Sequence, residues 1–165
     1  MDKPIPILVV SSEFENRCAL SDLLDREGRR ALCASTVSEC KELLACQQID
    51  LVFCERTLTD GTYRDILVVA RSLIRNVPLV VTSRLADWDE YLEALNDGAF
   101  DLIASPSQPA DVVRVLNQVH CEDRMADTSG GTKPIRPPRE PWLDPRRTNN
   151  TRQDNRTMTQ LRADS

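Results

Sequence analysis

The 165-residue chain has few aromatic residues, a single histidine and no long apolar run. Aromatic side chains make up 4% of the sequence and hydrophobic residues 41%, so a folded core must be mainly aliphatic. No apolar stretch approaches the roughly 20 residues that a transmembrane helix needs. The apolar run near the N-terminus is short and leads directly into Ser11 and Ser12, unlike a secretory signal peptide. We therefore expect a cytoplasmic protein without membrane association.

The chain also lacks the spacing of a zinc site, although it contains six cysteines. No two cysteines form a Cys-x-x-Cys pair, and His120 lies far along the chain from most of them. Zinc sites usually draw on closely spaced pairs of such ligands. We therefore expect no metal and no other cofactor, with reduced cysteines that act as small apolar side chains.

Charge is distributed unevenly along the chain. Residues 1–120 carry 12 basic and 19 acidic side chains, a net charge of −7, whereas residues 121–165 carry 9 and 7, a net charge of +2. Nucleic-acid-binding domains usually present a basic surface. The acidic body therefore argues against nucleic acid as a partner. A transcriptional regulator whose tail touches DNA stays open as an alternative, although no helix-turn-helix pattern follows residue 120.

The first 120 residues alternate between patterns typical of buried strands and of amphipathic helices. Short apolar runs predict five strands, at 7–10, 31–34, 51–54, 78–82 and 100–103. Five segments with helical spacing follow them and begin near residues 13, 37, 63, 88 and 109. This alternation predicts a parallel sheet that helices cover on both faces. Ser11 and Ser12 are expected to cap the first helix.

The pattern changes after about residue 121. From Asp127 onward apolar periodicity disappears, and five prolines within 134–145 stand among many Arg, Thr, Asn and Asp residues. Such a composition cannot bury enough apolar surface to offset the entropy that is lost on ordering. We expect residues 1–120 to form one domain and residues 121–165 to form a disordered tail.

Several motifs in residues 5–119 together resemble the receiver domain of two-component response regulators. They are ILVV followed by a polar run, DLVFCE followed by a turn and Gly61, VPLVVTS, and GAFD ahead of Ser105-Pro106. Their order and spacing are more specific than any one motif. The resemblance implies a flavodoxin-like α/β fold, a doubly wound five-stranded parallel sheet in the order 2-1-3-4-5 with five helices.

Receivers use a small set of side chains around a phosphoacceptor aspartate that follows the third strand. An acidic pair after the first strand helps to hold a divalent cation, and a lysine neutralises the phosphoryl group. A hydroxyl after the fourth strand and an aromatic residue on the fifth report phosphorylation. The resemblance places the phosphoacceptor at Glu55, the acidic pair at Ser11 and Ser12, the hydroxyl at Thr82, the lysine at Ser105 and the aromatic residue at Leu102.

Of these receiver positions, only the hydroxyl position, Thr82, carries the residue type that the family uses. Serine hydroxyls are poor replacements for carboxylates as Mg²⁺ ligands because they bring no charge, and Ser105 leaves no fixed cation for a phosphoryl group. We interpret the chain as a degenerate receiver, or pseudo-receiver, that is not an enzyme. It would act in bacterial phosphorelay-type signal transduction by protein–protein interaction without phosphorylation. In the alternative, Glu55 is a true phosphoacceptor.

Glu55 itself has two interpretations. As a leftover of the nucleophile it would be a solvated or strained carboxylate at a strand end, with Thr82 or Ser11 as hydrogen-bond partners, because a buried charge needs partners and the lysine is lost. Replacement by glutamine would then leave stability unchanged or slightly improved. As a built-in mimic of the phosphorylated state it would instead hold a partner surface in one conformation. The loss of both the lysine and the aromatic residue favours the leftover.

The expected fourth helix carries Trp88, Tyr91 and Leu92 at helical spacing. In receivers this helix contributes to the usual partner face, so the resemblance implies that a histidine kinase or an output protein binds near Trp88 and Tyr91. In the plainer interpretation, these aromatic residues pack on the core. The sequence leaves open whether the protein is a homodimer.

Overall fold

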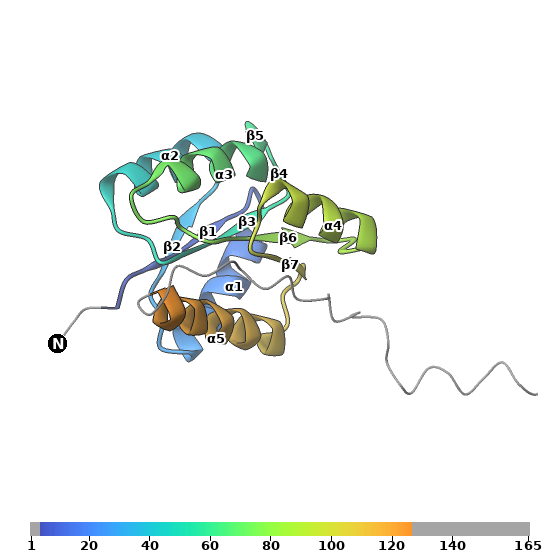
Figure 1. Cartoon of the computed structure of the whole chain (residues 1–165). Helices are drawn as coiled ribbons and strands as arrows, with labels where there is room; N and C mark the ends of the chain where they lie inside the picture. Colours follow the sequence, from blue (N-terminus) through green and yellow to red (C-terminus); the bar gives the residue numbers. More distant parts are fainter. Residues whose placement is uncertain (1–3, 127–165) are drawn as a thin grey trace, which may run out of the picture. The chain divides into compact units, whose positions relative to one another are not determined.

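The computed structural model describes the backbone of residues 4–126 and the side chains of residues 4–122. Its centre is a five-stranded parallel sheet (Figure 1). The strand order is β2-β1-β3-β6-β7, which is the flavodoxin-like order 2-1-3-4-5 that was expected. The strands are β1 (Ile7–Val10), β2 (Ala31–Ala34), β3 (Leu51–Glu55), β6 (Leu79–Ser83) and β7 (Asp101–Ala104).

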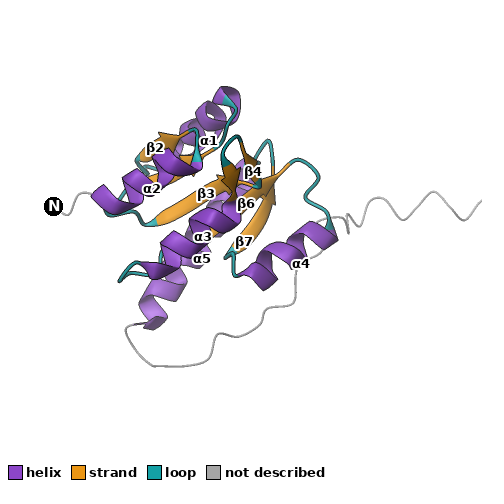
Figure 2. Cartoon of the chain, turned by 90° about the horizontal axis from the view of Figure 1, so that it is seen from above, coloured by secondary structure: helices purple, strands orange, loops and turns teal. Residues whose placement is uncertain are grey.

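Within the described residues, five helices cover the sheet on both faces, as the alternating patterns predict (Figure 2). One face carries α1 (Phe14–Arg26) and α5 (Pro109–Ala126). The other face carries α2 (Val37–Cys46), α3 (Tyr63–Ser72) and α4 (Trp88–Asp97).

Each face of the sheet buries its own mainly aliphatic cluster, because successive strand residues point to opposite faces. Leu8 and Val10 of β1 pack in the cluster under α2 and α3, whereas Ile7 and Val9 pack in the cluster under α1 and α5. All four side chains are at most 1% exposed. Burial on both faces explains why continuous apolar runs mark these strands in the sequence.

Two helix ends follow local signals. At the start of α2, the Thr36 hydroxyl accepts a hydrogen bond from the backbone N–H of Glu39 at 3.1 Å, which is a capping pattern. The second is the C-terminal end of α4, which stops at Gly98. The φ of this glycine is 99°, in the left-handed region that favours glycine. A side chain at this position would also overlap the guanidinium group of Arg71.

A two-stranded hairpin that the sequence patterns do not predict follows β3. Strand β4 (Thr57–Leu58) pairs antiparallel with β5 (Gly61–Thr62). The Asp60 carboxylate at its tip accepts hydrogen bonds from the backbone N–H groups of Val37 at 2.7 Å and Ser38 at 3.0 Å. These bonds lower the pKa of Asp60 and satisfy donors in the first turn of α2. The hairpin therefore depends on a distant contact that local patterns do not reveal.

Two helix boundaries also differ from the predictions. The residue that precedes α1 is Glu13, and no side chain caps this helix, so Ser11 and Ser12 are not the caps that were expected. At the other end of the domain, α5 continues to Ala126, beyond residue 120. The remainder of the expected disordered tail, residues 127–165, lies outside the described residues. No helix within residues 4–126 is long and apolar enough to cross a membrane.

Helix α4 buries different side chains from those that its apolar spacing predicts. Leu92 is 39% exposed, and Trp88 and Tyr91 are half-buried. The residues that α4 buries are Glu90 and Ala94. Tyr91 packs against the apolar cluster, and Glu90 is buried despite its charge because Arg56 and Ser83 are its partners.

Asp101 at the start of β7 is a second buried acidic residue, with 5% of its surface exposed. Burial raises the pKa of its carboxyl group, and the Arg114 guanidinium at 2.7 Å opposes that rise. We expect Arg114→Met to lower the free energy of unfolding at pH 7 by about 1–2 kcal/mol. This is less than for a fully buried pair, because the arginine side chain is 42% exposed.

The loss in the Arg114→Met variant should shrink as the pH falls toward 4. A raised pKa means that the folded state retains the proton of Asp101 to a higher pH than the unfolded chain does, and a neutral carboxyl group needs no cation. Urea unfolding across this pH range measures the effect, with the exposed Arg75→Met as the control variant. An equal loss at every pH would contradict this account of Asp101.

Candidate functional site

Polar side chains gather where the carboxyl ends of β1, β3, β6 and β7 meet. The structure brings all five predicted polar positions together at this edge. Glu55, Thr82 and Ser105 line a cleft of about 250 Å³, and Ser11 and Ser12 contact Glu55 from the loop after β1. Parallel strands place their carboxyl ends side by side, which is why residues so far apart in sequence meet.

Glu55 is half-buried, and one of its carboxylate oxygens is held by three donors. Oε2 accepts hydrogen bonds from the Ser11 hydroxyl at 2.8 Å, the Ser12 hydroxyl at 3.0 Å and the Ser12 backbone N–H at 3.0 Å. Hydrogen bonds to an ionised acceptor are stronger than neutral ones. The bond from Ser11 is one of those expected of Glu55, whereas the two bonds from Ser12 are not, and together they stabilise a carboxylate that is only partly solvated.

The serine pair changes what the edge of the sheet can bind. Carboxylates at positions 11 and 12 would repel Glu55 unless a cation lay between them, whereas hydroxyl donors contact it directly. Glu13, the acidic residue that follows, accepts a hydrogen bond from Asn16 at 3.0 Å and forms an ion pair with Arg84. Within the described part of the chain, no second carboxylate is directed toward Glu55, and the residues present do not fit Mg²⁺.

No metal-binding group of three or more His, Cys, Asp or Glu side chains occurs among the described residues. Thr82 pairs in register with Glu55 and is 8% exposed, so the retained hydroxyl lies at the predicted place. Leu102 is buried in the apolar cluster under α2 and α3. Leu102 therefore has no polar group that could form a hydrogen bond in response to a charge in the cleft.

The aromatic residues proposed for the partner face form a stacked pair. The ring centroids of Trp88 and Tyr91 are 5.7 Å apart, with an interplanar angle of 19°. Both side chains are half-buried, and Tyr91 packs against the apolar cluster under α2 and α3, as the plainer interpretation predicts for it. Burial raises the pKa of the Tyr91 hydroxyl.

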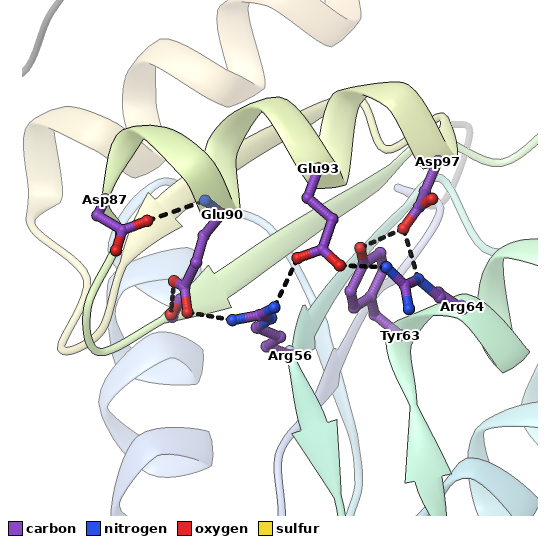
Figure 3. A network of polar contacts seen from close by, with 8 residues as sticks. Arg56, Tyr63, Arg64, Asp87, Glu90, Glu93 and Asp97 are labelled. Carbon is purple, nitrogen blue, oxygen red and sulfur yellow. Dashed lines mark hydrogen bonds and ion pairs between the residues drawn. The ribbon is translucent and has the colours of Figure 1, made fainter.

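The sequence patterns miss a polar network that begins beside Glu55 (Figure 3). Arg56 forms ion pairs with Glu90 and, at 2.6 Å, with Glu93. Glu90 is 7% exposed, and its other carboxylate oxygen accepts a hydrogen bond from the Ser83 hydroxyl. A buried carboxylate with two such partners replaces the apolar anchor expected of α4.

The network continues along α4 to its last turn. Arg64 forms ion pairs with Glu93 and, at 2.6 Å, with Asp97. The Tyr63 hydroxyl also donates to Asp97, at 2.5 Å. These two donors lower the pKa of Asp97, while burial and the bond to Asp97 raise the pKa of Tyr63 to about 12.

The spacing of the acidic residues contains a signal for this network. Glu90, Glu93 and Asp97 recur at three and four residues, so they share one face of a helix. An acidic face of this kind predicts that basic side chains lie opposite it. It does not identify Arg56 and Arg64, because that requires knowing that α4 lies beside the end of β3 and beside α3.

Comparison with known proteins supports the predicted resemblance. No family model matches the chain. The response regulator protein PilR of Pseudomonas aeruginosa is 27% identical over 128 residues, which cover 78% of this chain and 28% of PilR. The chemotaxis protein CheY of Thermotoga maritima is 27% identical over 118 residues, which cover 68% of this chain and 95% of CheY. The chain thus matches about a quarter of PilR and nearly all of CheY.

Solved structures show the same fold. The receiver domain of the Francisella response regulator 1452 has a TM-score of 0.65 at 16% identity and covers 72% of this chain and 98% of its own. A CheY-like receiver domain protein of Methanospirillum hungatei has a TM-score of 0.66 at 19% identity and covers 74% and 99%. Fold and sequence similarity together support a response regulator receiver domain.

The contacts of Glu55 predict coupled effects on stability. We expect Ser11→Ala and Glu55→Gln each to lower the free energy of unfolding by about 1 kcal/mol, because the first removes a charge-assisted hydrogen bond and the second removes its charge. The double variant should lose less than the two single losses combined, since both substitutions act on the same bond. Urea unfolding of the wild type, the two single variants and the double variant gives the four free energies of this double-mutant cycle.

Ser105→Ala serves as the control for that cycle, because Ser105 lines the same cleft and its side chain makes no hydrogen bond with the described residues. It should change stability by less than about 0.5 kcal/mol. An unchanged or increased stability of Glu55→Gln would restore the interpretation of Glu55 as an uncompensated leftover.

Proposed function

We propose that this receiver-type domain is degenerate and acts in two-component signal transduction by protein–protein interaction, without phosphorylation of Glu55. The observation that carries the proposal is the set of three hydrogen bonds from Ser11 and Ser12 to Glu55. They satisfy with neutral donors an oxygen that a receiver of the usual kind would offer to a cation. On this proposal the protein is a cytoplasmic, bacterial signalling protein and not an enzyme.

Phosphoryl transfer requires positive charge around the transferred group. At this edge of the sheet, Ser105 provides none, and the two arginines that line the cleft, Arg56 and Arg84, are already paired with carboxylates. The long Glu55 side chain is also directed to the loop after β1 by its own hydrogen bonds. These features support a site in which the charged side chains already have partners and need no phosphoryl group.

The relatives suggest the class of partner. PilR is named as a response regulator protein and CheY as a chemotaxis protein, which places both among signalling proteins. For this chain we propose a histidine kinase or an output protein as the partner. The NtrC4 receiver domain has been solved as a dimer at 18% identity to this chain, and a homodimer is the second arrangement that we propose to test.

The absence of phosphorylation is directly testable. After incubation with acetyl phosphate and Mg²⁺, intact-mass spectrometry should show no phosphoryl adduct, because the site lacks carboxylate ligands and a lysine. Titration calorimetry should detect no Mg²⁺ binding at millimolar concentrations. An added phosphate that maps to Glu55 would establish the alternative function.

A restored variant provides the positive control for both measurements. It combines Ser11→Asp, Ser12→Asp, Glu55→Asp and Ser105→Lys, which returns each changed polar position to the receiver chemistry. We expect this variant to bind Mg²⁺, since three carboxylates then converge on one point.

Partner binding should not depend on the charge of Glu55. With a kinase or output protein captured by the intact chain, calorimetric affinities of the wild type and Glu55→Gln should agree within about twofold, a difference below thermal energy. A tenfold difference would instead make Glu55 a mimic of the phosphorylated state.

A further inference from the structure

One carboxylate oxygen of Glu55 is left without a hydrogen bond. The bonds from Ser11 and Ser12 all end on Oε2, and no described residue donates to Oε1 or forms an ion pair with Glu55. Partial burial limits the water that can solvate this oxygen, and charged donors form stronger hydrogen bonds to a carboxylate than neutral donors do. Oε1 is therefore an open acceptor that favours a cationic donor.

Two hydroxyl groups beside Glu55 also lack partners. Neither the Thr82 hydroxyl nor the Ser105 hydroxyl forms a hydrogen bond with any described residue. Thr82 is only 8% exposed, whereas Ser105 is half-buried. A buried polar group without a partner is unfavourable and uncommon in proteins. A ligand that bonds to Thr82 would remove that penalty.

The strand ends place these three groups close together. Glu55 and Thr82 pair in register on adjacent strands, which lie about 4.8 Å apart in a parallel sheet. The Ser105 backbone N–H donates to the Ser83 carbonyl at 2.8 Å, so Ser105 lies on the side of β6 opposite to β3. Glu55, Thr82 and Ser105 all line the cleft of about 250 Å³. One small ligand can therefore contact all three side chains.

The size of the cleft limits the ligand to a few atoms. Sites for drug-sized molecules usually have volumes of about 300–1,000 Å³. Beneath the cleft, Thr82 and Ser105 also border a cavity of about 20 Å³, which has room for one group the size of a water molecule. At the cleft wall, Leu85 provides an apolar surface and is 75% exposed. The cleft therefore fits a small polar group with a short apolar chain.

The charges around the cleft determine the sign of that polar group. Arg56 and Arg84 line the cleft, but both are paired with carboxylates of other residues. The charge of Glu55 is thus the one without an ion-pair partner among the described side chains of the cleft, and it would repel an anion. An alkylammonium group carries three N–H donors and no acceptor, which matches three oxygen acceptors.

We infer that the cleft binds a small primary alkylammonium ligand, whose ammonium group donates to Glu55 Oε1 and to the hydroxyls of Thr82 and Ser105. The short alkyl chain lies along Leu85. The site needs a Glu55 without a phosphoryl group, and to that extent it rests on the proposed function. A phosphoryl adduct on Glu55 would refute that function, whereas failure of the unmodified protein to bind amines would refute this site alone.

Nuclear magnetic resonance of the full chain tests the site, with n-butylammonium chloride as the probe. The probe replaces sodium chloride at constant ionic strength and pH 7. The amide signals of Glu55, Thr82 and Ser105 should shift and saturate with a dissociation constant of about 1–10 mM, as expected for roughly five non-hydrogen atoms. Tetramethylammonium, which has the same charge but no N–H donor, should give no saturable shift. Equal responses to the two cations would overturn the proposal.

Four variants identify the side chains that bind the probe. Glu55→Gln should weaken butylammonium binding by about tenfold and Thr82→Val by about threefold, because they remove the charge and one acceptor. Ser105→Lys should abolish binding, since its own ammonium group then occupies the cleft. Glu15→Gln is the control, because Glu15 is an exposed acidic residue in the first turn of α1. An equal loss in Glu15→Gln and Glu55→Gln would mean attraction to surface charge only and would overturn the site.

A lysine side chain of a protein partner would present the same ammonium group. The two sources are distinguished by adding saturating butylammonium to the complex with a captured partner. Because we assign the site to a free amine, the partner affinity should stay within about twofold, a difference below thermal energy. Displacement of the partner by butylammonium would show that the partner supplies the ammonium group and would overturn the assignment to a free amine.

Discussion

A carboxylate at the carboxyl edge of a parallel sheet must be paired, because partial burial removes water without removing charge. In this domain the constraint falls on Glu55, and the two serines after β1 meet it. The loop after β1 is thereby fixed to the end of β3. Because the strands are neighbours in the sheet, this contact joins the two loops that define the cleft.

The same constraint recurs at Glu90 and Asp101, where arginine is the partner instead of serine. Glu90 and Asp101 are buried and Glu55 is half-buried, and each has a donor from a different element. An ion pair holds its geometry only while both members are present. The stability of this domain therefore depends on pairs of residues to a greater extent than an aliphatic core alone would require.

Much of the fold could be predicted from the sequence because the strands are buried on both faces and appear as apolar runs such as ILVV and LVFC. The position of Glu55 beside Ser11, Ser12, Thr82 and Ser105 also follows from the resemblance to receivers, since strand ends meet at one edge. The hairpin around Asp60 could not be predicted, because its stabilising contact lies on α2. The burial of Glu90 on α4 could not be predicted, because apolar spacing assumes that a helix buries apolar residues.

The hydrogen bonds of Ser11 and Ser12 have a consequence for the history of such a site. A single change of either serine to aspartate would place a second carboxylate beside Glu55, with too few ligands to hold a cation and no hydroxyl donor in its place. Each first step back toward a metal site is therefore unfavourable, although the complete set of changes is not. Under the proposed function, a return to phosphorylation chemistry therefore requires several of these substitutions together, because each one alone is unfavourable.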